Sequence, residues 1–222
     1  MKKIIDFFFD ISIHKTIYFN LYYFNFKTAI KFPVFISKNV VLKNMSGQIE
    51  LPNNCKTGII KIGFKSIGIF DHKRSKSIWE LKGRIIFKGN SFFGQGTKIS
   101  VDRAGELVIG NNLSITGEVQ IVSVKKVLFG SDCLVSWDCL IMDTDFHKIF
   151  DSNNNILNQP KEVIIGDNVR IGCRSIILKG SKIANNCILG SGSLITNHLS
   201  DSNSIYAGNP IKKIKENISW AL

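Results

Sequence analysis

The sequence lacks the cysteine and histidine patterns that build disulfide frameworks and metal sites. Its five cysteines include no CxxC pair, and its four histidines lie far apart in the chain: His14, His72, His147 and His198. Cys133, Cys139 and Cys187 fall at regularly spaced positions of small residues, so we expect them to be buried, reduced thiols. These features argue against a disulfide-stapled fold, predict no metal site and fit a reducing cytoplasm.

The sequence also lacks an apolar run of about 18 residues, the length that a helix needs to span a bilayer. Residues 1–33 begin like a signal peptide with Lys2 and Lys3, but Asp6 and Asp10 interrupt the apolar residues and no small-residue cleavage site follows. We expect one or two short helices here. Two interpretations of their aromatic residues stay open: packing on the end of the fold or on a neighbouring subunit, and contact with a membrane surface.

Acidic residues are few, because 17 Asp and Glu stand against 29 Lys and Arg, a formal net charge of +12. The basic residues are spread along the chain and no DNA- or RNA-binding motif is present, so nucleic acid is not the expected partner. A codon bias toward Lys, Asn and Ile explains part of the excess. The remaining anionic partners are a polyphosphate cofactor, an acidic polysaccharide, an acidic carrier protein and an anionic membrane.

What the sequence does have is a six-residue repeat. Aliphatic residues return at every sixth position: Ile165, Ile171, Ile177, Ile183, Leu189 and Ile195. Six steps of about 100° would scatter these side chains around a helix, whereas six steps along a strand return to the same face. Small residues keep the same spacing and suit a tight corner: Val169, Ser175, Ser181, Cys187 and Ser193. The repeat predicts a parallel β-helix, whose coils bury their apolar sides by stacking.

The repeat continues upstream with two slips and one long interruption. It can be followed from Phe87 to Ile141, and it slips near residues 100–107 and 123–128. Residues 143–162 are polar, carry no sixfold pattern and contain the Asp, Asn and Pro of turns, so they predict an inserted loop. Loops on a stiff scaffold are common places for catalytic residues.

The 222-residue chain is 44% hydrophobic, which is enough for one domain with a continuous core. The expected organisation, in chain order, is a helical segment, irregular strands or outer coils, a hexapeptide β-helix with the inserted loop, and a C-terminal tail: residues 1–33, 34–86, 87–199 and 200–222.

Two segments resemble a known family. The repeats "VIIGDNVRIGCRSIILKGSKIANNCILGSGSLIT" and the exit "YAGNPIKKIKE" are similar to those of the hexapeptide-repeat acyltransferases, in particular the bacterial polysaccharide O-acetyltransferases and galactoside acetyltransferase. The resemblance covers about residues 84–216. It implies an all-β fold, a left-handed parallel β-helix, together with a homotrimer and acetyl-CoA as the acetyl donor.

The resemblance places the family's catalytic histidine at His147, near the start of the loop. An imidazole that titrates near neutral pH can remove the proton of a sugar hydroxyl as that hydroxyl attacks. Asp143 and Asp145 precede His147 at alternate positions, which would put the three side chains on one side of an extended segment. Three roles compete for these carboxylates: orienting His147, binding acceptor hydroxyls and holding a divalent metal. We assign Asp145 to catalysis and Asp143 to acceptor binding, and we expect no metal because the histidines are too few.

Other site residues follow from the motifs. Trp137 and Asp138 would stack on and hydrogen-bond a sugar ring, although Trp137 is equally suited to packing at a subunit border. Matching the motifs to the family puts donor contacts at five positions: Cys173, Ser191, Thr196, Asn197 and Lys215. The chain departs from the family at two positions, because Arg170 replaces a common Trp and Asn197 a common Lys. Nearby positive charge could compensate for the missing lysine near the CoA phosphates: Lys212, Lys213 and His198.

The sequence therefore predicts an acetyl-CoA-dependent O-acetyltransferase that modifies a sugar of a bacterial surface polysaccharide or its precursor. Three alternatives stay open: N-acetylation of a nucleotide-linked amino sugar, acyl transfer from an acyl carrier protein, and a nonenzymatic β-helix scaffold. The expected partners are a glycan acceptor and two further copies of the chain; peripheral membrane contact through residues 1–33 is one of the two interpretations left open for that segment. The expected location is the cytoplasm, and membrane contact of residues 1–33 would place the protein at the inner face of the membrane.

Overall fold

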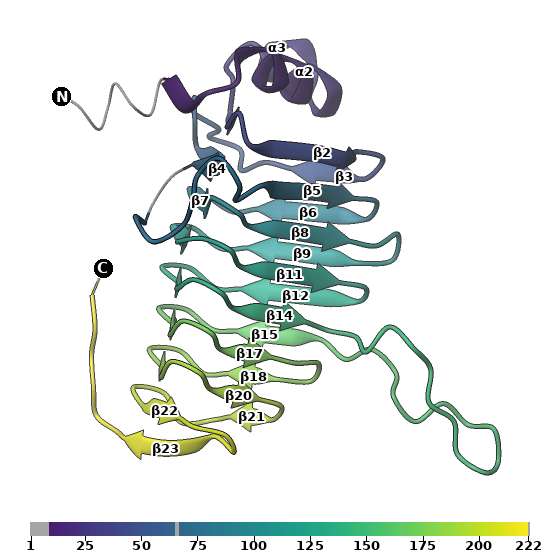
Figure 1. Cartoon of the computed structure of the whole chain (residues 1–222), viewed down its shortest axis with the longest axis vertical. Helices are drawn as coiled ribbons and strands as arrows, with labels where there is room; N and C mark the ends of the chain where they lie inside the picture. The colour runs from purple at the N-terminus through teal and green to yellow at the C-terminus, as the bar shows by residue number, and fades with distance from the viewer. Residues whose placement is uncertain (1–8, 65–66, 222) are drawn as a thin grey trace.

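A computed structural model of the chain describes residues 9–64 and 67–221. The chain winds into a tapering column of coils with helices at one end and a C-terminal strand at the other (Figure 1). Each coil contributes one strand to each of three sheets, and the strands within each sheet are parallel apart from β23. The part of the signal-peptide-like start that contains Lys2, Lys3 and Asp6 lies outside the described residues.

We number the three sheets in the order in which a coil visits them. The first sheet contains β1 (Val34–Ile36), β4 (Ile60–Phe64), β7 (Ser91–Gly94), β10 (Leu113–Ile115), β13 (Leu134–Val135), β16 (Arg170–Ile171), β19 (Ile188–Leu189), β22 (Ile205–Ala207) and β23 (Lys212–Lys215). The second sheet contains β2 (Val40–Asn44), β5 (Ser77–Leu81), β8 (Lys98–Val101), β11 (Gln120–Ser123), β14 (Leu140–Met142), β17 (Ile176–Ile177) and β20 (Leu194–Ile195). The third sheet contains β3 (Gln48–Glu50), β6 (Arg84–Phe87), β9 (Glu106–Ile109), β12 (Lys126–Phe129), β15 (Val163–Ile165), β18 (Lys182–Ile183) and β21 (His198–Leu199).

The six-residue repeat explains this arrangement. Successive members of the repeat lie in successive sheets, as Ile165, Ile171 and Ile177 lie in the third, first and second sheets. Residues one coil apart stand directly opposite each other, as Phe129 does with Ile165. Every aliphatic residue of the repeat from 165 to 195 is buried. The apolar positions therefore form rows along the inside of the column, and each coil is stabilised by its neighbours.

The corner between the third and first sheets explains the many Asn and Asp residues. One residue per coil adopts a positive φ there: Asn112, Asp132, Asn168 and Asn186, at 53–58°. Asn and Asp tolerate this left-handed conformation better than other side chains with a Cβ atom. They also bind from coil to coil, because Asn112 Nδ2 donates to Asp132 Oδ1 at 2.9 Å. The corner thus has its own ladder of side-chain hydrogen bonds.

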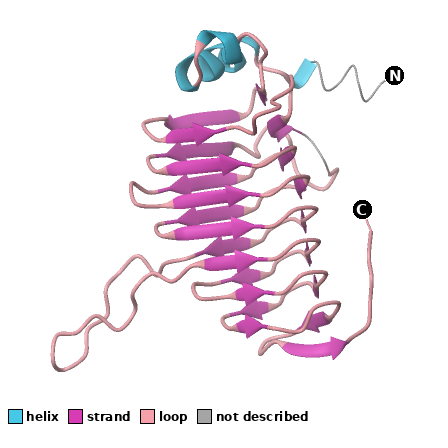
Figure 2. Ribbon diagram, turned by 180° about the vertical axis from the view of Figure 1, so that it is seen from behind, coloured by secondary structure: helices cyan, strands magenta, loops and turns pink. Residues whose placement is uncertain are grey.

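Two helices close the end of the column where the coils begin: α2 (Ile13–Tyr23) and α3 (Phe26–Ala29) (Figure 2). Phe19 of α2 is fully buried, with its ring centroid 5.3 Å from that of Trp79. The Asn20 side chain donates to Val34 O at 2.8 Å and accepts from Val34 N at 3.2 Å. α2 therefore covers the open end of the core and satisfies backbone groups of the edge strand β1. Among the described residues, no helix has both the length and the apolar character needed to cross a bilayer.

The coils extend beyond the expected limits of 87 and 199. Residues 34–86 form two outer coils, and β22 adds a strand to the first sheet after residue 200. Both slips of the repeat, near 100–107 and 123–128, lie where a coil passes from the second to the third sheet. The loop 143–162 is inserted at this same corner, between β14 and β15.

Candidate active site

The loop 143–162 forms an arm that projects from the corner between the second and third sheets, after β14 (Figure 1). An isolated antiparallel bridge joins Phe150 to Ile156 near its tip, and Leu157 N donates to Ile149 O at 2.8 Å. At the base of the arm, Lys161 N donates to Asp143 O at 3.1 Å. These backbone contacts give the arm a defined shape.

Asp143 is fully buried and does not face the loop surface. Its carboxylate accepts from the backbone N–H groups of Val124, Lys125 and Lys126 at 2.6–2.8 Å, and from Ser123 Oγ at 3.2 Å. The expected role in acceptor binding does not fit this geometry, because both oxygens are already used inside the corner. Asp143 instead ties the start of the arm to the preceding coil.

Asp145 lies on the exposed side of the same segment and pairs with Lys179 from the next coil. Asn158, on the returning half of the arm, donates to Asp145 Oδ2 at 3.0 Å and to His147 O at 2.6 Å. The hydrogen bond from Lys179, with a smaller one from Asn158, holds the pKa of Asp145 below its usual range. Asp145 is therefore a carboxylate at neutral pH, and its partners fix the backbone that carries His147.

The His147 side chain is exposed near the base of the arm. The backbone N–H of His147 donates to the backbone carbonyl of Asp145 at 2.7 Å. The intervening Phe146 has a φ of 63°, so the segment turns sharply and is not extended. The expectation that Asp143, Asp145 and His147 share one side is therefore wrong. Within the described part of the chain, the His147 imidazole makes no side-chain hydrogen bond or ion pair, so Asp145 holds the backbone at His147 and not the ring.

A second group of predicted site residues lies at the corner between the first and second sheets. Trp137 is half-buried there, and its carbonyl accepts from Arg174 N at 3.0 Å. Asp138 is exposed and lies 3.7 Å from Arg174 Nε. One coil further on, Cys173 Sγ donates to Ser191 Oγ at 3.4 Å. These side chains form a polar strip along one edge of the second sheet.

The remaining predicted donor residues are split between two places. Thr196 and Asn197 are exposed at the second-to-third corner, on the edge of the second sheet that also carries the arm. Lys215 ends the antiparallel strand β23 opposite Ile205. Lys213 of the same strand is engaged by Asp201 and Glu216, both at 3.0 Å, which raise its pKa. Lys213 is therefore less available for phosphate than its neighbours in the strand.

A single chain thus brings the predicted residues together as two groups on opposite edges of the second sheet. One edge carries His147, Asp145 and Asn197, and the other carries Asp138 and Cys173. Two positioning residues were missed by the sequence analysis, Lys179 and Asn158. Neither belongs to a motif, and both meet Asp145 only after the chain has wound through a further coil or returned along the arm.

The described residues include no group of three or more His, Cys, Asp or Glu side chains able to hold a metal ion. The chemistry available here consists of an exposed imidazole, a lysine-paired carboxylate and polar strips on either side of a flat sheet. Such an arrangement suits proton transfer at a solvent-exposed site.

Comparison with known proteins identifies the repeats. The sequence profile of the family described as "Bacterial transferase hexapeptide (six repeats)" matches residues 162–197. A Klebsiella pneumoniae protein described as "Uncharacterized 24.8 kDa protein in cps region" is 27% identical over 197 residues, which cover 88% of this chain and 84% of that protein. The "Polysialic acid O-acetyltransferase" of Escherichia coli O1:K1 / APEC is 32% identical over 125 residues, 55% of this chain. The match spans only 40% of that enzyme.

Solved structures agree on the architecture. The crystal structure of "the polySia specific acetyltransferase NeuO" superposes with a TM-score of 0.63 at 24% identity, and the match covers 85% of this chain and 87% of that one. At this identity the likeness concerns the fold. Together with the matched repeats, it confirms the resemblance to the hexapeptide-repeat acyltransferases and the predicted left-handed parallel β-helix.

Proposed function

We propose that this hexapeptide-repeat acyltransferase moves an acetyl group from acetyl-CoA to a hydroxyl of a bacterial surface polysaccharide or its precursor. The observation that carries the proposal is His147, whose imidazole is exposed and whose backbone is held at the base of the inserted arm by Asp145, Asn158 and Lys179. The relative described as "Polysialic acid O-acetyltransferase" supports both the reaction and a polysaccharide acceptor.

His147 acts as a general base in this proposal. Its imidazole takes the proton of the sugar hydroxyl while the hydroxyl oxygen attacks the acetyl carbonyl carbon. The C–S bond of the thioester then breaks, and the imidazolium returns the proton to the departing thiolate. Three of the cysteines, Cys133, Cys139 and Cys187, are buried, which favours direct transfer over an acyl-cysteine intermediate.

The donor would lie along the outside of the column. We assign it the predicted contacts Cys173, Ser191, Thr196 and Asn197, with Lys215 near the phosphates. Cys173 and Ser191 already form a polar step between adjacent coils, and such a step suits the amide groups of the pantetheine arm. Lys215 supplies positive charge without an ion pair among the described residues, whereas Lys213 is engaged by carboxylates.

We also propose that the active unit is a homotrimer with the site between subunits. The arm exposes large apolar side chains, among them Ile149 at 55% and Leu157 at 62%. Apolar groups on a projecting arm are stabilised when a neighbouring surface covers them. The two groups of site residues lie on opposite edges of the second sheet, so a second copy could complete a cleft that one chain leaves open.

The proposed location is the cytoplasmic face of the membrane, with α2 as the contact. One side of α2 presents exposed apolar residues: Ile13, Ile17, Tyr18, Leu21 and Tyr22. Residues 11–49 contain five lysines and no Asp or Glu. An apolar helix face surrounded by positive charge suits the headgroup region of an anionic bilayer.

The deciding experiment is acetyl transfer by the purified chain. Incubation with acetyl-CoA and a panel of bacterial glycans should release free CoA and add 42 daltons to an acceptor. An ester is cleaved by mild base and an amide is not, so base treatment distinguishes O-acetylation from N-acetylation. Loss of acetyl-CoA without acceptor-dependent product, or a base-stable product, would contradict the proposal.

A further inference from the structure

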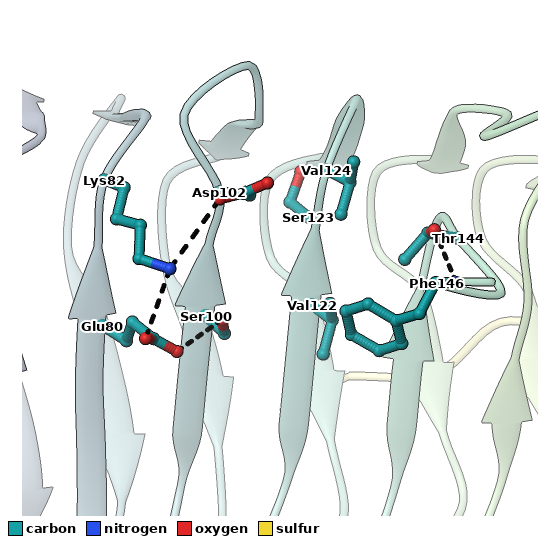
Figure 3. A pocket seen from close by; sticks show the side chains of 9 residues that line it. All are labelled: Glu80, Lys82, Ser100, Asp102, Val122, Ser123, Val124, Thr144 and Phe146. Atoms are coloured by element: carbon teal, nitrogen blue, oxygen red, sulfur yellow. Dashed lines mark hydrogen bonds and ion pairs between the residues drawn. The ribbon is translucent and has the colours of Figure 1, made fainter.

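We propose that a groove on the outer face of the second sheet binds uncharged sugar residues of the acceptor chain, next to the residue that is acetylated. This inference rests on the proposed function and extends it to the substrate class. The groove has a volume of about 400 Å³, within the range of small-molecule sites. It is lined by side chains from three successive coils and by Thr144 and Phe146 of the arm (Figure 3).

The groove runs along the column because outward-facing residues of adjacent strands stand in register. Glu80 of β5 is opposite Ser100 of β8, which is opposite Val122 of β11. Strands of a sheet are about 4.8 Å apart, so the three steps from β5 to β14 span roughly 14 Å. This length accommodates more than one sugar ring and favours a chain over a monosaccharide.

One end of the groove is apolar. The ring of Phe146 points toward Val122, and Val124 lies further along at the corner (Figure 3). Phe146 is 65% exposed, and its positive φ is uncommon for an aromatic residue. Residues in such conformations cluster at functional sites, and here the turn places the ring on the groove side of the arm (Figure 3). An exposed aromatic face is a suitable platform for the C–H face of a pyranose.

The other end of the groove is polar but carries little free charge. Lys82 Nζ lies 3.5 Å from Glu80 and 3.8 Å from Asp102, and Ser100 Oγ donates to Glu80 at 2.9 Å. Lys43, outside the groove, also pairs with Glu80 at 3.3 Å. The carboxylates can still accept from sugar hydroxyls, while the nearby cations are already neutralised. The groove therefore fits hydroxyl-rich, uncharged sugars better than a polyanionic chain.

The groove also ends at a residue next to the reacting group, because Phe146 lines it and His147 follows Phe146 in the sequence. Thr144 and Phe146 line it, and Asp145 and His147 alternate with them in the sequence. A glycan seated on Phe146 would thus present its next residue toward the base of the arm, where His147 is exposed. Holding neighbouring rings fixes the reacting hydroxyl at low entropic cost.

The test is direct binding of glycans to the full-length protein, measured by calorimetry without acetyl-CoA. The probes are maltohexaose, chitohexaose and the hexamer of polysialic acid, each compared with its monosaccharide. At least one neutral hexamer should bind more tightly than its monosaccharide and than the sialic acid hexamer. Phe146→Ala should weaken that binding by about tenfold, the loss expected for one aromatic contact. Phe150→Ala removes an exposed aromatic residue of the same arm outside the groove, and it should leave binding unchanged.

Two results would overturn the groove assignment: no neutral hexamer binding above its monosaccharide, or equal effects of Phe146→Ala and Phe150→Ala. Tighter binding of the sialic acid hexamer would overturn the uncharged substrate class. Because binding is measured without turnover, these failures are separate from failure of the proposed function, which appears as absent acetyl transfer while glycan binding is normal.

Discussion

At the scale of single residues, two exposed histidines allow a controlled test of catalysis. His147→Ala should lower kcat by about 10²–10⁴-fold, the range expected for loss of a general base, while acetyl-CoA binding stays close to that of the parent. His14→Ala, in α2 at the far end of the column, is the matched control and should leave kcat unchanged. Steady-state kinetics with a fixed acceptor measures both. Equal turnover in all three proteins would remove His147 from the mechanism.

A second prediction concerns which cysteines react with iodoacetamide, because burial lowers the reactivity of a thiol. Burial raises the pKa of Cys133 and of Cys139 to about 11, so at pH 8 both remain protonated and unreactive. Cys55 and Cys173 are half-exposed and should be the residues that iodoacetamide modifies. Saturating acetyl-CoA should slow the modification of Cys173 and leave that of Cys55 unchanged. Peptide mass spectrometry measures each site, and equal rates at Cys173 with and without donor would contradict its place in the donor site.

Part of the site could be predicted at this scale and part could not. His147 was found from the resemblance to the family, which places the catalytic histidine near the start of the polar loop. The roles given to Asp143 and Asp145 depended on an extended segment, but Asp143 is buried in the corner, and the turn at Phe146 separates Asp145 from His147. Lys179 was missed because its pairing with Asp145 joins residues 34 positions apart. Local spacing identifies residues near a site, whereas pairings across coils decide which side chain faces which.

At the scale of structural elements, the arm depends on one buried carboxylate. Asp143→Ala leaves three backbone N–H groups at the corner without their acceptor, so the free energy of unfolding should fall by about 2–4 kcal/mol. Asp151→Ala removes a carboxylate that also accepts backbone N–H groups, but at the exposed tip of the arm. Urea unfolding followed by circular dichroism compares the two. A smaller loss in Asp143→Ala than in Asp151→Ala would show that Asp143 does not hold the arm.

The helix α2 provides a prediction about location. Replacing Ile17, Leu21 and Tyr22 with Ser removes apolar area from the exposed side and spares the buried side. This variant should lose most of its binding to vesicles of phosphatidylcholine and phosphatidylglycerol, and binding of the parent should weaken as salt screens the lysines. Vesicle flotation measures both effects. If the parent does not float with anionic vesicles, or if the variant floats equally well, α2 is not a membrane contact.

The regularity of each element decided how well it could be predicted. From Ile165 to Ile195 every coil has short strands and equal corners, so the sixfold spacing is unbroken. The outer coils have longer strands and insertions, and their core residues Ile60 and Trp79 follow no sixfold spacing. The fold class could therefore be read from the best-kept coils, while the start of the column at Val34 could not.

At the scale of the whole molecule, the prediction concerns assembly. Three chains of 24.9 kDa give a particle of about 75 kDa, which light scattering should detect at micromolar concentration. Ile149→Asp combined with Leu157→Asp places charge on the exposed apolar side of the arm. The double variant should dissociate and lose kcat, because the proposed cleft needs a second copy. A parent protein that is monomeric and active would contradict the trimer.

Because the coils are stacked at a fixed spacing, positions along the surface of the column are separated by whole numbers of strand spacings. Each coil advances the surface by one strand spacing, about 4.8 Å, and each is held in register by the rows of aliphatic residues inside. The distance between the far end of the groove at Glu80 and the arm at Phe146 is thus quantised. An evolved variant that gained or lost one coil between these two points would have a groove longer or shorter by one strand spacing and would hold a correspondingly longer or shorter stretch of glycan. The residues around His147 would not need to change.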